Sequence, residues 1–174
     1  MPAAAKISGL ADAVAVIRGL WREPAFTYHG PVHHTQSAPF EPKPARPIPI
    51  WLGAFGARAL ALTGQVADGW IPSLGYAPAS QLPGMLTRVL DAAEAAGWRR
   101  GDVTCALNLQ IRLGAQPGAD ADTISGSAPQ VTDQLLAFTT VGFTAFNFMP
   151  VGSRPGEQLA RLAAEVIPAV RALA

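Results

Sequence analysis

Short apolar runs alternate along this chain with segments of helical periodicity, and this alternation is the feature that most limits its fold. The apolar runs are bounded by glycine, proline or polar residues, and they span residues 48–52, 68–72, 103–113 and 143–149. Each run is followed, directly or after a loop, by a predicted helix. Because strands joined through helices run parallel with right-handed crossovers, the sequence predicts an α/β fold with about four parallel strands and covering helices.

The predicted helices are defined by apolar residues that recur every three or four positions. They span residues 8–21, 57–67, 79–96, 127–141 and 155–173. Ser127 and Gln130 match a capping box, in which the serine accepts from a first-turn amide while the glutamine reaches back to the amide of the cap. Gly97 and Gly142 stand where a glycine commonly ends a helix. Local chemistry therefore supports the boundaries that periodicity suggests.

Two stretches lack a clear period. Residues 24–47 hold strand-like residues on both sides of Gly30-Pro31, and prolines then recur up to residue 47, so we predict a small hairpin followed by an extended connector. Residues 114–126 are rich in Gly, Ala, Asp and Ser, which predicts a mobile loop. The run at 48–52 is nearly all apolar, which is typical of a strand buried on both faces.

The composition fits a single globular domain over residues 1–174. Hydrophobic residues make up 49% of the sequence, enough for an ordinary core. Charged residues make up 14% and the net charge is +1, which argues against nucleic acid or an acidic membrane as a partner. The sequence has no signal-like segment and no run of the roughly 20 apolar residues that span a membrane, so we expect a cytoplasmic protein.

The single cysteine, Cys105, lies in an apolar run. This position indicates a small buried residue rather than a reactive thiol. One cysteine also excludes a disulfide within the chain and a cysteine-based zinc site.

Two architectures satisfy the element order, an open doubly wound sheet and part of a closed barrel, and periodicity does not separate them. Residues 47–60 (PIPIWLGAFGARAL) and 67–72 (ADGWIP) resemble the bacterial luciferase-like monooxygenase superfamily, especially members that use FMN or coenzyme F-420 (F420). Residues 26–30, 141–148 and 165–168 resemble the same family in the same order. The resemblance therefore covers nearly the whole chain.

The resemblance implies the C-terminal half of a TIM (β/α)8 barrel. Members of the family are complete barrels, and a typical barrel needs about 250 residues, so roughly the first four strand–helix units are missing here. In the family, that half contributes much of the flavin ring pocket and of the substrate cavity. Because a half-barrel leaves open sheet edges, we expect a homodimer or pairing with a complementary half-barrel.

The best candidate site is the turn between the strand at 48–52 and the following helix. Free backbone amides and the helix dipole converge at such a turn, and glycines let an anion approach the backbone. The alternative is a tight turn whose glycines serve geometry only. The resemblance implies that the turn binds the phosphate or the adjoining ribityl chain of FMN or F420. The residues of the turn are Gly53, Ala54, Phe55, Gly56, Ala57 and Arg58, of which the last adds positive charge.

Other polar residues are weaker candidates. Asp68 precedes a predicted strand, where an acidic residue more often anchors a loop than catalyses. Ser73 and Leu74 follow that strand, on the face where barrel enzymes build their sites. Asn147 is polar within a strand of phenylalanines, and its side chain either points into the barrel toward a ligand or bonds neighbouring backbone, of which we expect the second. Residues 152–156 precede the final helix, where either anion binding or simple capping accounts for them.

His29, His33 and His34 do not form a predicted metal site. They lie in a connector from a helix to a strand, which in a barrel is opposite the active site. No carboxylate or cysteine stands at ligand spacing beside them, so we predict no bound metal.

Two functions remain open. The resemblance implies a flavin- or deazaflavin-dependent oxidoreductase, in which bound FMN or F420 carries hydride transfer or monooxygenation and the protein provides position and electrostatics. The alternative is a non-catalytic half-barrel, either a truncated remnant or an interaction module that dimerises or pairs with a missing N-terminal half. The sequence contains no P-loop or HExxH motif, and no catalytic residue is assigned.

Overall fold

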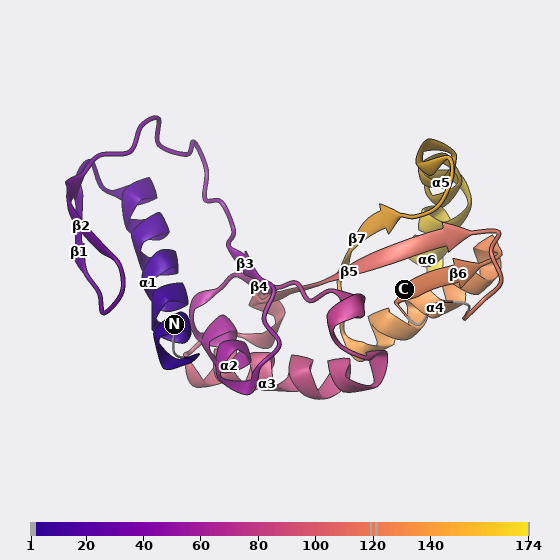
Figure 1. Ribbon diagram of the computed structural model, residues 1–174, viewed down its shortest axis with the longest axis horizontal. Coiled ribbons are helices and arrows are strands. Elements are labelled where there is room, and N and C mark those ends of the chain that lie inside the picture. Colours follow the sequence, from indigo (N-terminus) through magenta and orange to yellow (C-terminus); the bar gives the residue numbers. More distant parts are fainter. Residues whose placement is uncertain (1–2, 119, 121, 174) are drawn as a thin grey trace.

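A five-stranded sheet organises the chain (Figure 1). The computed structural model describes residues 3–118, 120 and 122–173. The strands of the sheet are β3 (Trp51–Leu52), β4 (Gly69–Trp70), β5 (Thr104–Leu113), β6 (Thr123–Gly126) and β7 (Ala145–Pro150). β3, β4 and β5 follow one another, and β6 and β7 both pair with β5. All pairs run parallel, which confirms the predicted α/β class.

Helices pack against one face of this sheet and form the core with it. The core helices are α2 (Ala57–Val66), α3 (Leu82–Ala95), α4 (Ala128–Val141) and α6 (Ile167–Leu173), whereas α5 (Pro155–Arg161) has no buried residue. α2, α3 and α4 lie along the same side of the strands (Figure 1). Every second residue of β5 from Cys105 to Leu113 is buried in this core. Trp70 and Phe143 are fully buried there, with ring centroids 5.8 Å apart.

The opposite side of the sheet, which we call the open face, is exposed. On β5, Gln110 and Arg112 alternate with the buried residues and are accessible to solvent. On β3, Trp51 is 38% exposed. The prediction that residues 48–52 are buried on both faces is therefore wrong. An apolar run shows that a strand can be covered, but the covering elements are decided elsewhere in the fold.

The N-terminal elements lie at the opposite end of the molecule from β7 and α5 (Figure 1). They are α1 (Ala3–Arg22), β1 (Phe26–His29) and β2 (His34–Ala38), of which the two strands pair antiparallel. Arg18 on α1 forms an ion pair with Asp68 at 2.8 Å. The Asp68 carboxylate also accepts from the Ile50 amide at 2.7 Å. Asp68 thus joins α1 and the segment before β3 to the segment before β4, which is a structural role.

A buried carboxylate, that of Asp12, holds the hairpin against α1. Asp12 is 3% exposed, and it accepts from the Val32 amide at 2.8 Å, the His33 amide at 3.0 Å and the Tyr28 hydroxyl at 3.0 Å. The His33 amide bond is the largest cause that holds the pKa of Asp12 below its ordinary value. Gly30 packs against the same carboxylate, because a Cβ there would lie 2.5 Å from its oxygens.

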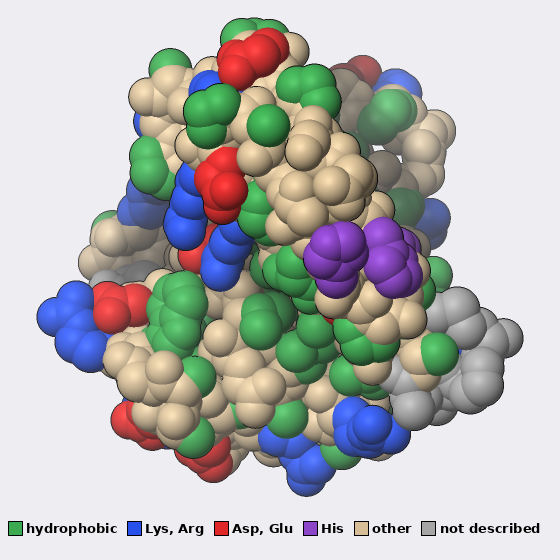
Figure 2. Space-filling view, turned by 90° about the vertical axis from the view of Figure 1, so that its left-hand side faces the viewer, with side chains coloured by type: hydrophobic (Ala, Val, Ile, Leu, Met, Phe, Trp, Pro, Cys, Tyr) green, Lys and Arg blue, Asp and Glu red, His purple; other side chains and the backbone are tan. Residues whose placement is uncertain are grey.

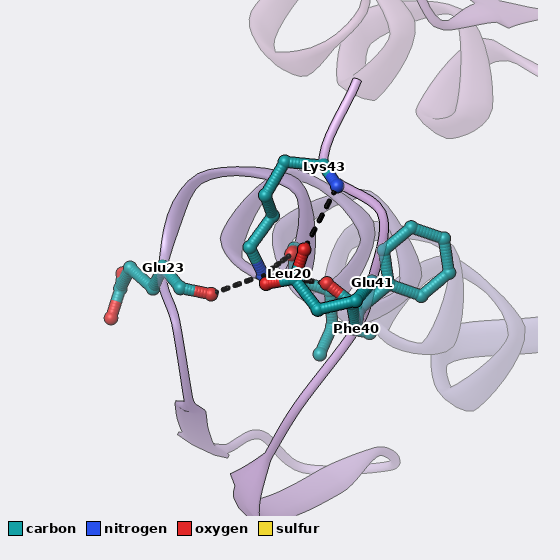
Figure 3. A network of polar contacts seen from close by, with 5 residues as sticks. All are labelled: Leu20, Glu23, Phe40, Glu41 and Lys43. Atoms are coloured by element: carbon teal, nitrogen blue, oxygen red, sulfur yellow. Dashed lines mark hydrogen bonds and ion pairs between the residues drawn. The ribbon is translucent and has the colours of Figure 1, made fainter. Parts of the chain in front are cut away.

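Lys43 ties the extended connector to the end of α1 (Figure 3). Its Nζ donates to the carbonyl oxygens of Leu20 at 2.9 Å, Glu23 at 2.6 Å and Phe40 at 2.8 Å. A cation at this end of a helix offsets the partial negative charge of the free carbonyls. The connector therefore leaves α1 from a fixed point on its way to β3.

Of the local predictions for the C-terminal part, one is confirmed and two differ from the structure. The capping box of Ser127 and Gln130 is present and confirmed. The predicted loop at 114–126 ends earlier than expected, because residues 123–126 are buried and form β6 against β5. Residues 119 and 121 of that predicted loop lie outside the described residues. The helix predicted over 155–173 is interrupted by a π-helical turn at Leu162–Val166. None of the described helices is long and apolar enough to cross a bilayer.

Candidate functional site

The turn between β3 and α2 presents free backbone donors to solvent. Gly56 is the N-cap of α2, and the first helical bond runs from the Leu60 amide to the Gly56 carbonyl at 2.9 Å. The amides of residues 57–59 therefore have no partner within the helix. Gly56, Ala57 and Arg58 are exposed. Such an arrangement accepts an anion without further rearrangement of the backbone.

The two glycines of the turn have different roles. A Cβ at Gly53 would lie 3.1 Å from the Ile71 carbonyl oxygen, so this glycine allows a close approach of neighbouring strands. A Cβ at Gly56 would meet no described atom within 4 Å. The geometric explanation therefore applies to Gly53, whereas the space above Gly56 is free for a ligand.

The base of the turn is held by the core. Ala54 is 7% exposed, and its carbonyl accepts from the buried Nε1 of Trp70 at 2.9 Å. Phe55 rests against the ring of Tyr76, with centroids 5.7 Å apart. The turn is thus a fixed platform rather than a free loop.

The charge of Arg58 is uncompensated. Among the ion pairs of the described residues, none involves Arg58. A cation near a helix N-terminus is disfavoured by the helix dipole, whereas a bound anion is favoured by the dipole and by the positive charge of Arg58. An anion at this turn would therefore offset the repulsion between Arg58 and the dipole.

A row of polar side chains crosses the open face from the segment after β4 to the middle of β5 and β7. The register places Asn108 of β5 beside Asn147 of β7, and Ser73 beside Asn108. The Asn147 Nδ2 donates to the Asn108 Oδ1 at 2.8 Å, and the Asn108 Nδ2 donates to the Ser73 Oγ at 3.1 Å. We call these three side chains the polar row. The expectation that Asn147 bonds backbone is wrong.

The polar row keeps unused hydrogen-bonding capacity. Each amide nitrogen has a second N–H, the Asn147 Oδ1 is an acceptor, and the Ser73 hydroxyl is a donor. Asn147 is exposed, and Asn108 and Ser73 are partly exposed. Leu74, the other residue expected here, is 5% exposed and packs into the core, so it does not face a ligand.

The turn follows β3, and Ser73, the first member of the polar row, follows the neighbouring strand β4. The Ile71 amide donates to the Leu52 carbonyl at 3.0 Å, which brings the end of β3 beside the segment that leads to Ser73. Ligands of parallel α/β folds bind at the C-terminal ends of the strands. The turn therefore has free backbone amides at the end of β3, and the polar row has free donors and acceptors that begin at Ser73, just past the end of β4.

The remaining candidates are the three histidines and Cys105. The histidine side chains gather on the surface of the hairpin end (Figure 2), and the rings of His29 and His34 are 6.5 Å apart. Within the described part of the chain, no group of three or more His, Cys, Asp or Glu residues is placed to hold a metal ion. Burial raises the pKa of the Cys105 thiol to about 11, so this thiol stays protonated near neutral pH.

Known proteins resemble this chain in sequence over most of its length. A family model described as luciferase-like monooxygenase matches residues 1–121. The F420-dependent glucose-6-phosphate dehydrogenase of Nakamurella multipartita is 31% identical over 106 residues, which is 61% of this chain and 31% of that protein. The protein of the same name from Microbacterium testaceum is 29% identical over 102 residues, or 59% of this chain and 30% of that protein. The match thus spans about a third of these curated relatives.

Solved structures resemble the fold of the whole chain. An F420-dependent secondary alcohol dehydrogenase in complex with an F420-acetone adduct has a TM-score of 0.86 at 17% identity, and the match covers 98% of this chain and 64% of that one. A long-chain alkane monooxygenase has a TM-score of 0.73 at 12% identity, covering 97% and 57% respectively. At such low identities, the similarity shows the fold alone. The structural similarity confirms the partial TIM barrel rather than the doubly wound sheet.

Proposed function

We propose that this chain, which belongs to the luciferase-like monooxygenase family, supplies the C-terminal half of an F420- or FMN-dependent oxidoreductase. In this proposal the turn from Gly53 to Arg58 binds the phosphate of the cofactor. Relatives named for F420 and a neighbouring monooxygenase support this class of reaction. The chain spans less than two thirds of those proteins, so the complete activity requires the elements that they have in addition.

One observation carries the proposal, the combination of free amides and unpaired charge at the turn. The amides of residues 57–59 are free of helical partners, Gly56 leaves open space above them, and Arg58 has no ion-pair partner among the described residues. A phosphate satisfies the amides and neutralises the guanidinium at once. Both FMN and F420 carry a phosphate, so the turn fits either cofactor.

The chain's own contribution to the reaction is positioning. The bound cofactor supplies the hydride chemistry. The turn fixes the phosphate, and Trp70 holds the turn in place through the Ala54 carbonyl. The polar row provides donors and acceptors to the cofactor ring or to the substrate beside it. Holding two reactants close together in the correct orientation provides a large part of enzymatic rate enhancement.

Titration of the purified protein with FMN and with F420 tests this function. We expect saturable binding of one of them. Arg58→Gln should weaken it roughly tenfold, as loss of a charge-assisted hydrogen bond does. Arg88→Gln, which removes an exposed arginine from α3, is the matched control and should leave binding unchanged. The absence of saturable binding of either cofactor would overturn the proposal.

A second candidate function, as an interaction module, is favoured by the edges of the sheet. β3 and β7 have only one neighbouring strand each among the described residues. Beside β7, a cavity of about 580 Å³ is lined by Phe146, Phe148, Ile167 and Val170. Unpaired strand edges next to apolar surface favour association. A second copy or a complementary half-barrel would cover them. A strictly monomeric elution at micromolar concentration, without aggregation, would count against this function.

A further inference from the structure

We propose a second anion site, in which Arg112 binds a carboxylate or phosphate group of the substrate. It lies between the ends of β5 and β7, where a cavity of about 330 Å³ is lined by Arg112, Gly114, Gly152, Ser153 and Gln158. This inference rests on the proposed oxidoreductase function, because it names the class of substrate that the same end of the sheet would receive. It is separate from the cofactor turn, which follows β3.

The position of Arg112 is fixed by the strand and by a glycine. Ile111 and Leu113 point into the core, so the alternation of β5 directs Arg112 to the open face. Gly152 has φ of +99°, and a Cβ there would lie 3.3 Å from the Arg112 Nε and 3.5 Å from its Nη2. The guanidinium therefore lies over Gly152, where a side chain would displace it.

Hydrogen bonds hold the walls of the cavity. The Leu113 amide donates to the Gln158 Oε1 at 2.7 Å, and the Gln158 Nε2 donates to the Leu113 carbonyl at 3.2 Å. On the other side, the Gly114 amide donates to the Gly126 carbonyl at 2.7 Å. The backbone around the cavity is therefore ordered before a ligand binds, which lowers the entropic cost of binding.

The cavity carries a positive charge that no carboxylate balances. Five arginines of the described residues lie within ion-pair distance of acidic side chains: Arg18, Arg99, Arg100, Arg154 and Arg161. Arg112 is not among them, and no acidic residue lines its cavity. A guanidinium stays ionised and matches the two oxygens of a carboxylate or phosphate. The unbalanced charge therefore selects an anion.

The location assigns this anion to the substrate. Asn108, Gln110 and Arg112 follow one another on the open face of β5, and Arg112 lies about 13 Å along the strand from Asn108. A molecule seated at the polar row could thus extend an acidic group to Arg112. In TIM barrels, loops that follow the last strands frequently bind phosphate groups. A carboxylic acid or phosphate ester fits this arrangement, whereas a hydrocarbon leaves it unused.

Amide NMR of the purified protein, titrated separately with inorganic phosphate and with succinate, tests this site. We expect saturable shifts at Gly114, Gly152 and Ser153 with at least one of the two. Arg112→Gln should weaken them roughly tenfold, and Arg112→Lys, which keeps the charge without the planar fork, should weaken them less. Arg58→Gln should leave these shifts unchanged. If Arg112→Gln does not fold, the Arg112→Lys titration decides.

The outcomes separate this site from the cofactor turn. Shifts confined to residues 56–59 would overturn the Arg112 site and leave the proposed function standing. Shifts at Gly152 that are unchanged by both Arg112 substitutions would also overturn it. If FMN or F420 shifts Gly152 and Arg112→Gln weakens the cofactor as much as Arg58→Gln does, the anion belongs to the cofactor and the substrate assignment is wrong.

Discussion

Replacement of Trp70 by phenylalanine should destabilise the protein and loosen the cofactor turn. The Trp70 Nε1 donates to the Ala54 carbonyl at 2.9 Å in a buried environment. Trp70→Phe leaves that carbonyl without its donor, which costs about 1–3 kcal/mol. The smaller ring also leaves space beside Phe143, at about 1–2 kcal/mol. We expect a total loss of about 3 kcal/mol, which lowers the Tm by about 6–12 °C in a chain of this size.

Urea denaturation followed by circular dichroism measures the stability of this variant. Trp51→Phe is the matched control, because the Trp51 indole is 38% exposed and its loss should change stability by less than about 0.5 kcal/mol. Titration with the cofactor provides the second measurement, since a loosened turn holds the phosphate less well. If the free energy of unfolding of Trp70→Phe lies within about 1 kcal/mol of that of the unmodified protein, the hydrogen bond from Trp70 to Ala54 does not support the turn as described.

Two further predictions concern packing and pH. Gly64→Ala places a Cβ 2.1 Å from the Val89 carbonyl oxygen, so α2 and α3 must separate, and denaturation should show that the free energy of unfolding falls by about 1–3 kcal/mol. The control is Gly84→Ala, whose Cβ meets no described atom within 4 Å, and it should instead raise the free energy of unfolding by up to about 1 kcal/mol. Because the pKa of Asp12 is lowered in the folded state, its stabilisation is complete above the unfolded value of about 3.9 and is lost as the pH falls through the lower folded value. Asp12→Asn should therefore flatten the acid side of the stability profile, and an unchanged profile would contradict this role.

Much of the fold was predictable because its signals are local. The capping box of Ser127 and Gln130 and the terminal Gly142, with φ of +118°, lie within a few residues of the α4 ends that they define. β6 was missed because a strand of four residues has little period of its own. It is a strand because it pairs with β5.

The candidate site also combines features that the sequence shows with features that only the fold creates. The turn from Gly53 to Arg58 is contiguous, so the sequence pointed to it. The sequence did not separate the packing role of Gly53 from the open space at Gly56, because Ile71 decides it from another strand. Asn108 and Asn147 are 39 residues apart, and only the register of β5 and β7 brings them together. A shift of one residue would turn Asn147 toward the core.

The sequence by itself determined the order of strands and helices, their approximate ends and the family, because periodicity, caps and motifs act within a few neighbouring residues. Only the tertiary structure decided that one face of the sheet stays open, that three polar side chains form a row across it, and that Arg112 lies unpaired over Gly152. Those features depend on contacts between residues far apart in the chain, and such contacts are set by packing and strand register rather than by local propensity.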